Sequence, residues 1–104
     1  RLYHIVVVDM REIGIKELLK LNNPLIIDIR SHNSFLEEHI PHSINIPYLE
    51  LIIEYPKKLR KDIIYYICCE EGQKGREVVN YLSLKGYKVV NVMGGYEAYK
   101  NNRY

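Results

Sequence analysis

Residues 62–74 read DIIYYICCEEGQK. The first part of this stretch is mostly β-branched and aromatic, which predicts a buried strand. Residues 75–85 follow with apolar side chains at the three- and four-residue spacing of a helix, and Gly86 stands where a helix C-cap glycine belongs. The sequence therefore predicts that Cys69 lies on the turn between a strand and the N-terminus of a helix.

A thiol in this position has two sources of electrostatic support. Unpaired backbone N–H groups of the loop and of the first helical turn can point at the sulfur or at a bound anion. The helix dipole also favours the thiolate, the nucleophilic form of cysteine. We interpret Cys69 as the candidate nucleophile, and Gly72 as a residue with positive φ or with an N–H group free to approach the sulfur. Cys68 still belongs to the strand pattern and is interpreted as a packed core thiol, with a resolving cysteine as the alternative.

The composition predicts one domain over residues 1–104 that buries a core without disulfides or metals. The formal charge of +2 and the scattered basic residues argue against a nucleic-acid partner. No apolar run has the length of a membrane span, and no signal peptide is visible. The two cysteines are adjacent and predict free thiols in a reducing compartment, the cytoplasm. We expect no cofactor, and the histidine and cysteine spacing does not suggest zinc.

Strand and helix patterns alternate about five times along the chain. The expected strands cover residues 2–8, 25–30, 43–46, 62–68 and 87–92. The expected helices cover residues 13–21, a short segment with Phe35 and Leu36, residues 48–54 stopped at Pro56, residues 75–85 and residues 96–101. This alternation predicts an α/β fold with a central parallel sheet of about five strands and helices on both faces. Ligands of such sheets bind outside the carboxyl ends of the strands, where Cys69 is expected.

Several motifs of the chain resemble those of the rhodanese-like family in order and spacing. They are DIR at residues 28–30, EHIPHSINIP at 38–47, CEEG at 69–72, GYKV at 86–89 and the glycine pair 94–95. The resemblance extends from about residue 25 to the end of the chain. It implies the rhodanese-like fold.

The resemblance also implies sulfur-transfer chemistry at an active-site loop running from Cys69 to Lys74. Cys69 would accept a sulfane sulfur as a persulfide and pass it to cyanide or to a thiol, in two displacements. The implied function is that of a sulfurtransferase or persulfide carrier, whose partners are a small sulfur donor or a protein persulfide and a thiol acceptor. Around the catalytic Cys69, the implied substrate-binding residues are Glu70, Glu71, Gly72, Gln73, Lys74 and Gly75.

Two acidic residues distinguish this loop from those of many active family members. The carboxylates of Glu70 and Glu71 oppose a thiolate and repel thiosulfate, a dianion. Lys74 supplies a compensating positive charge, and Arg76 is a second candidate. The two acids are either solvated charges or selectors of a neutral, cationic or protein-bound substrate.

The polar residues near the expected sheet edge receive structural interpretations. Asp28 and Arg30 are expected to form an ion pair, with substrate contact by Arg30 as the alternative. His39 is expected to stabilise a turn, with a general base as the alternative. Glu38 and His42 replace glycines of the family pattern, which predicts a local change in that turn.

Two other functions remain as alternatives. A cysteine phosphatase or arsenate reductase of the related fold needs a longer loop that ends in arginine. Arg76 stands one position too far from Cys69 for that pattern, and Lys74 closes a shorter loop, so the loop length favours sulfur over phosphate. The second alternative is a non-catalytic regulatory or protein-binding module, which the acidic loop favours and the presence of Cys69 disfavours.

Overall fold

The computed structural model describes residues 11–102, and these residues form a five-stranded sheet in the order β1-β5-β4-β2-β3. All four strand pairs are parallel. The strands are β1 (Glu12–Ile13), β2 (Leu25–Asp28), β3 (Ile44–Asn45), β4 (Ile64–Cys68) and β5 (Lys88–Val92). The helices are α2 (Ile15–Lys20), α3 (His32–Glu37), α4 (Tyr48–Lys58), α5 (Gln73–Leu84) and α6 (Gly95–Asn102). The strand expected over residues 2–8 lies outside the described residues.

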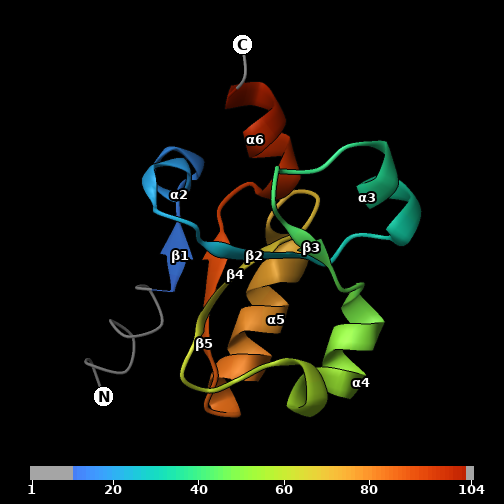
Figure 1. Ribbon diagram of the computed structural model, residues 1–104, viewed down its shortest axis with the longest axis vertical. Coiled ribbons are helices and arrows are strands. Elements are labelled where there is room, and N and C mark those ends of the chain that lie inside the picture. The colour runs from blue at the N-terminus through green and yellow to red at the C-terminus, as the bar shows by residue number, and fades with distance from the viewer. Residues whose placement is uncertain (1–10, 103–104) are drawn as a thin grey trace.

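Helices cover both faces of the sheet, as the alternation predicts (Figure 1). On one face, apolar side chains of α4 and α5 pack against β2, β4 and β5 around the fully buried Ile27 and Ile67. On the other face, Leu18 of α2 and Tyr96 of α6 pack against Ile26 and Val92. The sheet is therefore buried on both sides over its central strands, which explains their nearly continuous apolar sequence.

The first described strand and helix differ from the expected helix over residues 13–21. Ile13 pairs with Val92 at the sheet edge, and its carbonyl accepts a hydrogen bond from the N–H of Met93 at 2.9 Å. Gly14 is the extended N-cap residue, so α2 begins at Ile15. Ile13 fits the apolar spacing of the expected helix although it belongs to β1. Its side chain packs against the same core as Leu18 of α2, the helix that follows.

The expected end of a helix at Pro56 is wrong. Helix α4 includes Pro56 and continues to Lys58, and the N–H of Leu59 still donates to the carbonyl of Tyr55 at 2.9 Å. Proline removes a single helical hydrogen bond here, close to the end of the helix. Buried Leu59 and the edge-on packing of Tyr55 against Tyr87 hold this last turn on the core.

The carboxyl ends of the central strands meet at one edge of the sheet. Asp28 of β2 pairs with Cys68 of β4, and Ile67 pairs with Asn91 of β5. The loops that follow these strands therefore share one end of the molecule, where ligands of parallel sheets bind. Across the described part of the chain, no helix has both the length and the apolar character needed to cross a membrane.

Candidate active site

Cys69 directly follows β4, and its sulfur lies against two backbone amides. The N–H of Gly72 donates to Sγ at 2.9 Å, and the N–H of Gly75 donates at 3.2 Å. Gly72 has a φ of +104°, a left-handed conformation that a side chain would strain. The expected positive φ at Gly72 and the expected approach of bare N–H groups to the sulfur are both confirmed.

Gly75 has no space for a side chain. Helix α5 begins at Gln73, two residues earlier than expected, so Gly75 lies in its first turn. A Cβ atom on Gly75 would stand 3.4 Å from Sγ of Cys69 and would overlap Oδ1 of Asn91. The absence of this atom lets the helix backbone come close enough for its amide to reach the sulfur.

The start of α6 holds the other side of the loop. The N–H of Tyr96 donates to the carbonyl of Cys69 at 2.7 Å, and the N–H of Glu97 donates to the carbonyl of Glu70 at 3.0 Å. These two amides belong to the first turn of α6 and have no helical partner of their own. The loop is thus fixed between the N-termini of two helices.

A buried asparagine, which the sequence analysis missed, holds the loop from β5. Nδ2 of Asn91 donates to the carbonyl of Gly72 at 3.2 Å and to Oε2 of Glu12 at 3.0 Å. The same carboxylate oxygen accepts from Nε of Arg76 at 2.6 Å. The hydrogen bond from Asn91 lowers the pKa of Glu12 below its usual value, although partial burial acts in the opposite direction. The hydrogen bond and the charge of Arg76 also lower this pKa. The signal in the sequence is an amide side chain within an otherwise apolar strand.

Arg30 forms the expected ion pair with Asp28. Its guanidinium donates to both carboxylate oxygens, with Nη2 at 2.8 Å from Oδ2, and also to the carbonyl of Glu38. The guanidinium lies 4.1 Å above the ring of Tyr96, and the side chain is only 7% exposed. Burial acts to lower the pKa of Arg30, but the hydrogen bonds and charge of Asp28 outweigh it and raise that pKa above its usual value.

The histidine of the turn before β3 has a structural contact, as expected. The ring of His39 stacks on the ring of Phe35 with centroids 3.7 Å apart, and Nδ1 lies 2.6 Å from the carbonyl oxygen of Phe35. His42 has a φ of +70°, a left-handed conformation that glycine favours and that residues with side chains adopt rarely.

A pocket of about 240 Å³ opens at the loop and has an acidic lining. Its lining residues are Cys69, Glu70, Glu71, Gln73, Lys74 and Glu77. Five of the expected site residues therefore line one pocket, while Gly72 and Gly75 supply amides behind it. Glu77 was not predicted as a site residue. Its position three residues after Lys74 could have indicated it, because residues at this spacing are neighbours on the surface of a helix.

Lys74 and Arg76, the two cations expected to compensate the loop charge, are both held by acidic partners. Nζ of Lys74 lies 3.9 Å from Oε1 of Glu77 and 4.5 Å above the ring of Tyr48. Arg76 is bound to Glu12, as described above. The positive charges of Lys74 and Arg76, which were expected to offset the acidic loop, are therefore also paired with the carboxylates of Glu77 and Glu12.

The two adjacent cysteines face opposite sides of the sheet. Cys68 is 1% exposed and packs in the cluster formed by α2 and α6, whereas Cys69 belongs to the cluster formed by α4 and α5. Both are free thiols. Burial, together with the carboxylate of Asp28, raises the pKa of the Cys68 thiol. The interpretation of Cys68 as a packed core thiol is confirmed.

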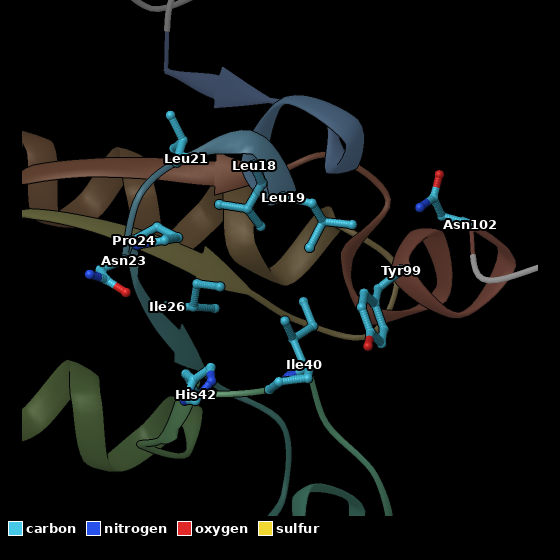
Figure 2. A pocket seen from close by; sticks show the side chains of 11 residues that line it. Leu18, Leu19, Leu21, Asn23, Pro24, Ile26, Ile40, His42, Tyr99 and Asn102 are labelled. Atoms are coloured by element: carbon cyan, nitrogen blue, oxygen red, sulfur yellow. The ribbon is translucent and has the colours of Figure 1, made fainter.

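A larger pocket of about 440 Å³ lies away from the cysteine loop, between α2, α6 and the turn before β3 (Figure 2). Its lining is mostly aliphatic, with Leu18, Ile26 and Ile40 at its base and Tyr99 from α6 at one side. Cys69 does not line this pocket. The smaller pocket is therefore the one that contains the candidate nucleophile.

Fold and loop together define a class: parallel α/β proteins with a cysteine at the carboxyl end of a central strand and backbone amides directed at its sulfur. Comparison with known proteins identifies the family within this class. Residues 14–102 match the model of the rhodanese-like domain. The chain belongs to the rhodanese-like family.

Individual relatives agree with this assignment. The chain is 32% identical over 85 residues to the thiosulfate sulfurtransferase GlpE of Coxiella burnetii, covering 81% of this chain and 78% of the relative. It is 32% identical over 96 residues to the putative sulfurtransferase YtwF of Bacillus subtilis, covering 88% and 92%. A crystal structure of a rhodanese-related protein from Thermoplasma volcanium superposes with a TM-score of 0.79 at 30% identity, covering 90% of this chain and 94% of that one.

Proposed function

We propose that this protein is a sulfurtransferase or persulfide carrier that works through Cys69. The observation that carries the proposal is the pair of amides, from Gly72 and Gly75, that donate to Sγ at 2.9 and 3.2 Å. Donors at this distance stabilise negative charge on sulfur and are already in place before the reaction. Membership of a family with relatives named sulfurtransferases supports the same chemistry.

The proposed reaction consists of two displacements at sulfur. The Cys69 thiolate attacks the sulfane sulfur of the donor, a new S–S bond forms, and the remainder of the donor leaves with the electron pair of the broken bond. An acceptor thiolate then attacks the outer sulfur of the Cys69 persulfide. The S–S bond to Cys69 breaks, and Sγ regains its electron pair as a thiolate facing the same two amides.

The lining of the 240 Å³ pocket bears on the substrate. Three carboxylates, from Glu70, Glu71 and Glu77, face one ammonium group, from Lys74, which already has Glu77 as a neighbour. The pocket therefore opposes a small dianion such as thiosulfate. A neutral or cationic thiol, or a persulfide carried on another protein, fits this lining better. The two free thiols suit a reducing compartment such as the cytoplasm.

Phosphate chemistry is less well supported by the same loop. A phosphatase needs an arginine that closes around a tetrahedral oxyanion. Nε of Arg76 instead lies 2.6 Å from a carboxylate oxygen of Glu12, and the Arg76 side chain is 60% exposed.

The test is intact mass spectrometry of the Cys68→Ser protein after incubation with thiosulfate, with mercaptopyruvate, or with a cysteine desulfurase and cysteine. We expect a gain of one sulfur atom that cyanide removes, and no gain in the Cys68→Ser/Cys69→Ser protein. No gain with any of the three donors would contradict the proposal. The non-catalytic binding module would then be the better assignment.

A further inference from the structure

The side chain of Asn91 contacts both glycines whose amides donate to the Cys69 sulfur. It lies in β5 and is 1% exposed. Its Nδ2 donates to the carbonyl of Gly72, and its Oδ1 lies against Gly75, where a Cβ atom would overlap it. Gly72 and Gly75 are the residues whose N–H groups donate to Sγ of Cys69.

Gly72 needs such a restraint because of its own freedom. A glycine in the left-handed region has no side chain that packing could hold. Its carbonyl accepts from Asn91 at 3.2 Å and from the N–H of Arg76 at 3.2 Å. Together these two bonds fix the peptide that follows Gly72, and hence the position of Gly72 beside the sulfur.

Glu12 in turn orients the asparagine. Its carboxylate accepts from Nδ2 of Asn91 at 3.0 Å, which directs the amide nitrogen toward the loop. The opposite atom of the amide, Oδ1, is buried and has no hydrogen-bond partner among the described residues. An unpaired buried oxygen is unfavourable, so the orientation depends on the two acceptors that Nδ2 serves and on the close approach of Gly75.

We propose that Asn91, oriented by Glu12, is a positioning residue that sets the two amide donors at the Cys69 sulfur. This inference rests on the proposed sulfur-transfer function for its kinetic consequence, but the reactivity of the thiol itself reports on it separately. Asn91 does not line the pocket, so it acts on the sulfur through Gly72 and Gly75 and not on the donor or acceptor.

The experiment uses Asn91→Ala, Asn91→Ser and Glu12→Gln, each in the full chain with Cys68→Ser. Asn80→Ala is the matched control, because Asn80 is exposed on α5. The first readout is the rate of Cys69 alkylation by iodoacetamide at pH 7. The second is steady-state sulfur transfer to cyanide, with kcat and KM determined separately. Urea unfolding shows which variants are folded.

For Asn91→Ala we expect alkylation and kcat to fall about tenfold, the value of one hydrogen bond to a charged group, with KM changed less than twofold. Glu12→Gln keeps an acceptor for Nδ2 and should lower both rates about threefold, while Asn80→Ala should match the parent protein. Unchanged alkylation in a folded Asn91 variant would overturn the inference. Should Asn91→Ala not fold, Asn91→Ser and Glu12→Gln decide by the same criterion.

Failure of this inference and failure of the proposed function give different results. If the parent protein forms no persulfide, the proposed function fails, but the alkylation series still tests the role of Asn91. If the parent transfers sulfur and the folded Asn91 variants do so equally fast, only the positioning role fails.

Discussion

Nη1 of Arg30 lies 3.8 Å from Oε1 of Glu70, a carboxylate that lines the pocket beside Cys69. The same guanidinium binds both carboxylate oxygens of Asp28 and is almost fully buried. Its single positive charge is therefore shared between two acids. Glu70 is restrained near the loop without being neutralised, and Glu71 adds a second negative charge to the lining.

The first prediction concerns the charge of the pocket. In the Glu70→Gln/Glu71→Gln protein, the catalytic efficiency with thiosulfate should rise about tenfold at low salt, because two repulsions against a dianion are removed. The gain should shrink at 0.5 M salt (roughly a 4 Å screening length), since exposed charges are then screened. Steady-state kinetics with cyanide as acceptor measure both values.

The matched control for this prediction is Glu50→Gln/Glu54→Gln. It changes the net charge by the same amount on α4, where both residues pair with Lys58 and neither lines the pocket. An equal gain in the control would show that total charge, and not the loop, governs the rate. Unchanged or lower catalytic efficiency in the Glu70→Gln/Glu71→Gln protein would mean that the carboxylates of Glu70 and Glu71 in the parent do not oppose the donor.

The second prediction separates the two cysteines. Cys69→Ser should abolish sulfur transfer, because a hydroxyl forms no persulfide. Cys68→Ser should retain most of it, because that thiol faces the opposite core. Parallel assays of both folded proteins with the same donor decide this point. Equal loss in both would mean that the cysteines act as a pair.

The third prediction is a loss of stability at alkaline pH that depends on Cys68. Its pKa is raised in the folded protein above the ordinary value of 9.0, so the thiol contributes stability below pH 9 that is lost as the pH rises and the unfolded chain ionises. Between pH 8 and pH 10.5 the stability advantage of the parent over Cys68→Ser should shrink by roughly 2 kcal/mol. Urea unfolding of both proteins at the two pH values measures it; a constant difference would contradict it.

The fourth prediction concerns acid. The pKa of Glu12 is lowered in the folded protein from its ordinary value of 4.5, so its contribution is complete above that value and is lost as the pH falls through the folded pKa. The parent should be more stable than Glu12→Gln at pH 7, and the difference should diminish below pH 4.5. Thermal unfolding at pH 7, 5 and 3.5 gives the comparison. A difference independent of pH would show that the charge of Glu12 contributes nothing.

Much of the architecture follows from local sequence signals. Apolar runs that end in Asp28 and Cys68 predict parallel strands whose carboxyl ends share one edge of the sheet, and the structure has this arrangement. The strand order is not encoded locally, because β5 comes to lie between β1 and β4 only through pairing between distant residues. The helical turn at Pro56 depends likewise on the packing of Tyr55 and Leu59, which no short window of sequence contains.

The site shows the same division between local and distant information. The loop geometry could be predicted, because Cys69 and Gly72 are close in sequence and their spacing lets the Gly72 amide reach the sulfur. The hydrogen bond between Asn91 and Glu12, which holds the loop from β5, could not be predicted. These two residues are separated by 79 positions and meet only in the folded sheet. An asparagine within an apolar strand indicates a buried polar contact, but its partners come from the tertiary structure alone.

The opposite orientation of the two adjacent thiols has a consequence for oxidative damage. Peroxide would convert a reactive Cys69 thiolate into a sulfenic acid, which many proteins rescue by closing a disulfide with a neighbouring cysteine. Cys68 is on the far side of β4 and is the chain's only other cysteine. Among residues 11–102 no second thiol faces Cys69, so we expect the reduction of an oxidised Cys69 to depend on a thiol from another molecule.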